Sequence, residues 1–194
     1  MMVAISSGNT KIGNTPNISL SRDSCQPGLP CYNTCYAKKA WQMYPEVRKA
    51  WSGNWEAYKT NPDEFFSIID SFLVKNKSKY FRWHVCGDIP DEQYLVKMID
   101  LAKKHSNVIF ISSTKQHALI DKLKNNIPAN LVMYASMWPN WGNPQQIKDF
   151  PKIWMADKEN KEDRYNKNIF VCPGYCPSCR HCWKVRTDIL IHQH

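Results

Sequence analysis

The chain has 194 residues, of which 43% are hydrophobic and 12% aromatic, enough for one domain with its own core. No apolar run approaches the roughly 20 residues that a membrane helix needs, so we expect no membrane-spanning helix and no membrane partner. The formal net charge of +9 is typical of proteins that bind nucleic acid or a phosphorylated small molecule. A soluble protein with a basic surface and no such partner would carry the same charge.

The first residues, MMVAISSGNTK, lack the basic segment and apolar core of a secretory signal. We therefore expect a cytoplasmic protein. In a reducing compartment, clustered cysteines bind metal more often than they form disulfides.

Strand and helix patterns alternate along the chain. In chain order, the sequence predicts a strand at residues 18–21, helices at 32–44, 46–59 and 61–73, a strand at 80–85, a helix at 95–102, a strand at 108–112, a short helix at 119–123, and strands at 131–135, 153–156 and 169–171. Pro45 separates the first two helices, and Asn61 is the expected cap of the third. The alternation predicts an α/β fold with a mostly parallel sheet.

About six strands are too few for a closed eight-stranded barrel, so we expect an open, partial (β/α)6-like barrel. Residues 1–194 are expected to form a single domain with a cysteine-rich tail at 172–183. The polar run at 157–168 is expected to be a surface loop.

Chemically useful residues follow the predicted strands at their carboxyl ends, where the loops of parallel sheets converge. They are Cys25, Cys31 and Cys35 after the first strand, Cys86, Gly87 and Asp88 after the second, Lys115 after the third, and Cys172, Cys176, Cys179 and Cys182 after the last. We expect them to meet at one edge of the sheet.

The tail cysteines have the spacing C-x3-C-x2-C-x2-C. A structural zinc site usually takes two C-x2-C pairs that lie further apart, although Cys176 and Cys179 together with two upstream thiols would satisfy it. An iron–sulfur cubane, a [4Fe-4S] cluster, has separate corners that closely spaced cysteines reach. Cys176, Cys179 and Cys182 match the C-x2-C-x2-C run of such sites, and Cys172 supplies a fourth ligand or serves a second cluster.

The upstream cysteines, Cys25, Cys31 and Cys35, follow a strand and lead into a helix. Three thiolates hold a cubane whose fourth iron is open or bound by a distant ligand. Cys86 is the expected distant ligand, or else a small buried residue. The eight cysteines then divide into two sets of four, and we expect one or two clusters.

Four further residues are candidates for binding a cofactor or substrate. Strand alternation places Arg82 and His84 on one face, where they bind an anion or move a proton, unless His84 is a structural histidine. Asp88 is a general base, a ribose contact or a helix cap. Lys115 contacts a phosphate or carboxylate, or is simply solvated.

Five segments together are similar to those of a family of small bacteriophage proteins, the gene-product-eighty-eight family. The segments are SGNTKIG, CYAKKAW, YPEVRKAW, FRWHVCGDIPDEQY and CPGYCPSCRHCW. The resemblance covers most of the chain and implies a viral protein in the host bacterial cytoplasm, but no activity.

The cysteine loop that ends in Cys-Tyr-Ala also resembles, more distantly, the cluster loop of radical S-adenosylmethionine (SAM) enzymes, which have a partial α/β barrel. The resemblance implies that Cys25, Cys31 and Cys35 hold a cubane whose open iron binds the cofactor. It places Gly87 and Asp88 at the cofactor's amino group or ribose. The loop is longer here than the usual C-x3-C-x2-C.

The sequence therefore predicts an iron–sulfur protein, in one interpretation a minimal radical-SAM-like redox enzyme with an electron donor as partner. The alternative is a non-catalytic protein, stapled by iron–sulfur or zinc, that binds nucleic acid or a host protein. Arg180, Lys184 and Arg186 flank the tail cysteines and either contact nucleic-acid phosphates or offset thiolate charge. The substrate and oligomeric state stay open.

Overall fold

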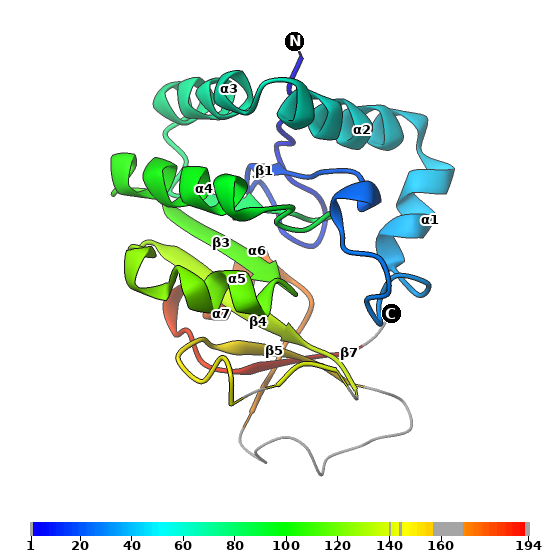
Figure 1. Ribbon diagram of the computed structural model, residues 1–194, viewed down its shortest axis with the longest axis vertical. Coiled ribbons are helices and arrows are strands. Elements are labelled where there is room, and N and C mark those ends of the chain that lie inside the picture. The colour runs from blue at the N-terminus through cyan, green and yellow to red at the C-terminus, as the bar shows by residue number, and fades with distance from the viewer. Residues whose placement is uncertain (1, 140, 144, 157–168, 193–194) are drawn as a thin grey trace.

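A seven-stranded sheet runs through the computed structural model of the protein, which describes residues 2–139, 141–143, 145–156 and 169–192 (Figure 1). The strands are β1 (Asn17–Ile18), β2 (Tyr80–Trp83), β3 (Ile109–Thr114), β4 (Leu131–Met137), β5 (Lys152–Ala156), β6 (Phe170–Val171) and β7 (Ile189–His192). Their order is β1-β2-β3-β4-β5-β7-β6, and each neighbouring pair is parallel. The sheet is open and does not close into a barrel.

The helices lie between the strands. They are α1 (Tyr36–Met43), α2 (Pro45–Thr60), α3 (Pro62–Lys75), α4 (Glu92–Lys104), α5 (His117–Lys122), α6 (Cys176–Cys179) and α7 (His181–Lys184), with 3-10 turns η1 (Arg22–Ser24) and η2 (Lys124–Asn126). Within the part of the chain that the structure describes, no helix has both the length and the apolar surface to cross a bilayer.

Local signals in the sequence explain where the helices begin. Pro45 is the first residue of α2 and separates it from α1, as predicted. The Asn61 side chain accepts a hydrogen bond of 3.1 Å from the backbone N–H of Glu64 and so caps α3. Asp91 does the same for α4, through the N–H of Tyr94 at 2.8 Å.

The two faces of the sheet have different covers. One face packs against α2, α3, α4 and α5 in the main core, to which β2 contributes Phe81 and Trp83. The other face packs against the C-terminal segment through a smaller cluster that includes Tyr134 and the fully buried Trp183. Figure 1 shows the orange-to-red C-terminal segment behind the sheet, with α4 and α5 in front.

The α/β class and the parallel sheet are confirmed, and each predicted strand overlaps with an observed one. The number of strands differs, because β7 was not predicted. It has only four residues and lies between β5 and β6, so its place depends on long-range pairing. The surface loop predicted at residues 157–168 lies outside the described residues.

Candidate functional site

Cys25, Cys31, Cys35 and Cys86 lie together at the carboxyl ends of β1 and β2, and we call them the N-terminal thiol set. Each member is within electrostatic range of others. Burial raises the pKa of the Cys25 thiol to about 12, and the nearby charges of Asp88, Cys31 and Cys35 act in the same direction. Burial also raises the pKa of Cys86, with Cys35 and Cys25 contributing. Without a metal, the thiols of Cys25 and Cys86 therefore stay protonated at neutral pH, whereas a bound metal deprotonates them.

Polar contacts between two loops hold the N-terminal thiol set in place. The hydroxyl of Ser19 accepts hydrogen bonds from the N–H groups of Val85 and Cys86, at 3.1 and 3.3 Å. Gly87 has φ 86°, and a Cβ there would lie 2.7 Å from the Ser24 hydroxyl. Because Gly87 has no side chain, the loop after β2 can pack directly against the loop after β1. This packing keeps Cys86 beside Cys25.

Asp88 is buried and joins the loop after β2 to the end of β3 through its carboxylate, and to the loop after β1 through its N–H, which donates to the Ser24 hydroxyl at 3.2 Å. Its carboxylate accepts hydrogen bonds from the Thr114 hydroxyl at 2.5 Å and from the N–H groups of Lys115 and Ile89, at 3.0 and 2.8 Å. The cap of α4 is Asp91, so the prediction of Asp88 as a helix cap is wrong. The roles of Asp88 as a general base and as a ribose contact stay predictions.

Lys115 lies beside the N-terminal thiol set at the end of β3. Its side chain hydrogen-bonds to Cys31 and thereby opposes the rise in the pKa of Cys31 that burial causes. The residue is only half-buried, so its ammonium group is in reach of both a thiolate and solvent. A cation here offsets the negative charge of the thiolates.

His84 does not share a face with Arg82, so that prediction is wrong. Its backbone has φ 59°, which breaks the strand alternation, and its ring lies in the main core with Nε2 3.0 Å from the Tyr94 hydroxyl. Burial lowers the pKa of His84 to about 4, so the ring is neutral at physiological pH. Nδ1 has no hydrogen-bond partner among the described residues. This environment is that of a structural histidine, and binding of a ligand by His84 stays a prediction.

Cys172, Cys176, Cys179 and Cys182 form the C-terminal thiol set, in and around α6 and α7. All four line a small cavity of about 20 Å³. Burial raises the pKa of the Cys182 thiol to about 12, and the charges of Cys176, Cys172 and Cys179 contribute. The structure thus places the cysteines in two groups of four, and the predicted partition of the cysteines between two clusters stays a prediction.

Contacts from both ends of the chain position the C-terminal thiol set. The Cys176 N–H donates to the Lys11 carbonyl, and the Arg180 guanidinium donates to the Thr15 hydroxyl, both at 2.8 Å. Trp183 packs edge-on against Tyr80 with their ring centroids 5.1 Å apart. The tail is thus held against the sheet and against the N-terminal segment.

Tyr36 is a site residue that the sequence analysis missed. Its ring is 59% exposed, but its hydroxyl points inward and donates to the Val85 carbonyl, close to Cys86, Cys35 and Cys25. Desolvation of this hydroxyl raises the pKa of Tyr36 to about 12. The available signal was its position, directly after Cys35 at the start of α1.

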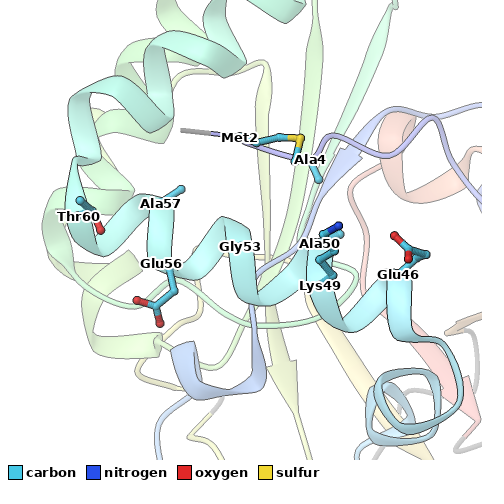
Figure 2. Close-up of a pocket in the computed structure, with 9 residues that line it drawn as sticks. All are labelled: Met2, Ala4, Glu46, Lys49, Ala50, Gly53, Glu56, Ala57 and Thr60. Atoms are coloured by element: carbon cyan, nitrogen blue, oxygen red, sulfur yellow. The ribbon is translucent and has the colours of Figure 1, made fainter.

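Two observations delimit the candidate site. Among the described residues, no three or more His, Cys, Asp and Glu side chains converge as the ligands of a single metal ion would. A larger pocket, of about 490 Å³, lies away from both thiol sets, between Met2 and Ala4 on one side and α2 on the other (Figure 2). Small residues such as Ala50 and Gly53 line it, and no thiol does. This pocket and the two thiol sets are therefore separate parts of the molecule.

The fold and these sites define a parallel α/β protein with two cysteine-rich segments, of which the first lies at the carboxyl edge of its sheet. The chain belongs to the gene product 88 family of bacteriophage proteins, whose model matches residues 4–147. The match includes the N-terminal thiol set and ends before the C-terminal one. The predicted phage family is thus confirmed. No curated protein and no solved structure matches the chain.

Proposed function

We propose that this protein binds iron–sulfur clusters and acts, through its N-terminal thiol set, as a minimal radical-SAM-like enzyme. The observation that carries the proposal is the gathering of eight cysteines into two groups of four. Four thiols from loops that follow two different strands meet at the carboxyl edge, where parallel α/β proteins bind cofactors. We interpret the open sheet as the partial barrel of such enzymes.

The residues present fit a cubane in each set. Thiolates are the ligands of [4Fe-4S] clusters, and a cubane binds them at separate corners, so its ligands need not converge on one point. Cations stand beside the sulfurs: Lys115 beside Cys31, and Arg180 near Cys176. Positive charge there stabilises the anionic, metal-bound form of the thiols.

The N-terminal thiol set supplies three ligands and a choice for the fourth. Cys25, Cys31 and Cys35 would hold three irons, while Cys86 either binds the fourth or leaves it open to SAM. When bound and reduced, such a cluster supplies the electron that cleaves SAM. Gly87 presents backbone to this site without a side chain, and Asp88 fixes the loop that the cofactor's amino group or ribose would contact.

The C-terminal thiol set would hold a second cubane that relays electrons from a donor protein or positions the substrate. Zinc stays the alternative metal, but it needs four tetrahedral ligands around a single ion, an arrangement that neither set shows among the described residues.

Anaerobic purification and elemental analysis test the proposal directly. We expect a brown protein with iron and acid-labile sulfide in equal amounts, and 5′-deoxyadenosine upon incubation with SAM and dithionite. Cys31→Ala should abolish this cleavage, whereas Cys86→Ala should preserve it if the fourth iron is open. A colourless protein that contains zinc and no sulfide would contradict the proposal.

A second function is favoured by the contacts between the tail and the N-terminal segment. Because Cys176 and Arg180 bond to Lys11 and Thr15, a metal in the C-terminal thiol set would staple both ends of the chain without any catalysis. With a net charge of +9, such a protein would bind nucleic acid. Binding to single- and double-stranded DNA that weakens steeply with salt, in the absence of SAM cleavage, would favour this function over the enzyme.

A further inference from the structure

Arg82 occupies the face of the sheet that the main core leaves uncovered. Its neighbours in β2, Phe81 and Trp83, are fully buried under the helices, so alternation directs Arg82 to the opposite face. Tyr80 points to that face too, where it contacts Trp183 of the tail. The register places Arg82 beside Asn17 of β1 and Ile111 of β3, in the body of the sheet.

Among the described residues, no anionic side chain pairs with the guanidinium of Arg82. Within the described residues it makes no ion pair and no hydrogen bond, although the side chain is half-buried. Arg180, on the same face, differs: it donates to the Thr15 hydroxyl and lies over the Tyr80 ring at 4.9 Å. An arginine that is partly removed from water without a partner is costly, and this cost is recovered when an anion binds.

The surroundings of Arg82 place it between the two thiol sets. Its charge acts on Cys176 and Cys182 of the C-terminal thiol set, and also on the hydroxyl of Tyr36. That hydroxyl is in turn within range of three sulfurs of the N-terminal thiol set. A molecule bound at Arg82 is therefore within electrostatic range of the C-terminal thiol set and of Tyr36 beside the N-terminal one.

We propose that Arg82 binds an oxyanion, a carboxylate or phosphate group of the substrate, between the two thiol sets. The assignment of this anion to a substrate rests on the proposed enzymatic function. The planar guanidinium donates two parallel hydrogen bonds to such a group. The anion belongs to the substrate and not to SAM, because the cation that contacts the N-terminal thiol set directly is Lys115.

The test uses the full chain with its metal and measures the affinity for inorganic phosphate and for acetate by isothermal titration. Arg82→Gln should weaken the binding of the oxyanion at least tenfold, and Arg82→Lys should recover part of it. Arg48→Gln is the matched control, because Arg48 is an exposed arginine on α2 and belongs to neither thiol set, and it should bind like the wild type.

Three outcomes would overturn the inference. The first is equal affinity of the wild type and Arg82→Gln for phosphate and acetate, including no binding by either. The second is weaker binding of SAM with unchanged oxyanion binding, which assigns Arg82 to the cofactor. The third is loss of iron from Arg82→Gln with unchanged oxyanion binding, which makes Arg82 a counterion of the thiolates. Iron and sulfide measured in the same samples test the proposed function separately. A metal-free or zinc-bound chain that still binds phosphate through Arg82 contradicts the proposed iron–sulfur function but not the oxyanion site.

Discussion

The two thiol sets are built in opposite ways. The N-terminal thiol set is assembled from the loops after β1 and β2, and buried polar contacts of Ser19, Ser24 and Asp88 lock these loops together. The C-terminal thiol set comes from a single run of chain that lies across the sheet, anchored mainly by Trp183. The first set is therefore part of the sheet edge, whereas the second is a docked segment.

This difference indicates which of the two thiol sets would depend on a bound metal for its folded structure. Removal of metal from the N-terminal thiol set leaves the strand ends and their hydrogen bonds in place. The C-terminal thiol set is held mainly by Trp183, so a metal bound there would contribute more to the folding of that segment. We expect hydrogen exchange after chelation to increase in residues 172–185 and to change little in the loops around Cys25 and Cys86.

The largest expected effect separates the sets by function. Cys35→Ala should abolish SAM cleavage and remove one cluster's iron, because a cubane loses a corner ligand beside the cofactor. Cys179→Ala should remove the other cluster's iron while the N-terminal centre still cleaves SAM. Iron content and 5′-deoxyadenosine formation measure both. If the two variants lose the same activity, the sets do not act as separate centres.

The next-largest expected effect is the loss of stability when the tail loses its anchor on the sheet. Trp183→Ala should destabilise the protein by about 3–5 kcal/mol, because it leaves a cavity between the tail and the sheet. Tyr175→Ala, on the same segment but with an exposed side chain, should change stability by less than about 0.5 kcal/mol. Urea unfolding measures both free energies. A small effect of Trp183→Ala would mean that the tail is held in another way.

Two glycines probe how tightly each loop is packed. Gly87 and Gly174 both have positive φ, 86° and 74°, so alanine costs about 1–2 kcal/mol of backbone strain at either position. At Gly87 the new Cβ also meets Ser24 and Leu20, which adds about 1–3 kcal/mol, whereas nothing lies within 4 Å at Gly174. Thermal unfolding of the two variants should rank Gly87→Ala as the less stable. The reverse order would contradict the close packing at the N-terminal thiol set.

The smallest expected effect is the pH dependence of the free energy of unfolding that His117, near Asp88, contributes. Burial lowers the pKa of His117 below its usual value of 6.5, and its Nε2 lies 3.0 Å from the Ser136 carbonyl. Since the unfolded chain binds a proton more readily, the free energy of unfolding should fall as the pH drops below 6.5. His117→Gln keeps a hydrogen-bond donor and should flatten this dependence in urea titrations at several pH values. An unchanged profile would exclude His117 as its source.

Local patterns in the sequence predicted most of the fold and the composition of both thiol sets. Caps such as Asn61, breaks such as Pro45 and short apolar runs are signals within a few residues, and each was confirmed. The membership of Cys86 in the N-terminal set was also foreseen, because carboxyl ends of parallel strands converge.

The rest depended on long-range contacts. Alternation in β2 gave the wrong face for His84, because its left-handed backbone conformation turns the ring into the core. The role of Asp88 as a tie between loops requires Thr114, which is distant in the chain. The neighbours of Arg82 come from the tail, whose docking no local pattern encodes.

The position of β7 sets an order of assembly during synthesis. Among the described strands, β6 pairs with β7 alone, so the strand that precedes Cys172 has no partner in the sheet until residues 189–192 leave the ribosome. The strands that carry the N-terminal thiol set pair with each other much earlier. The strands beside one proposed metal centre are thus in place early in synthesis, and those beside the other only after residues 189–192 have been made.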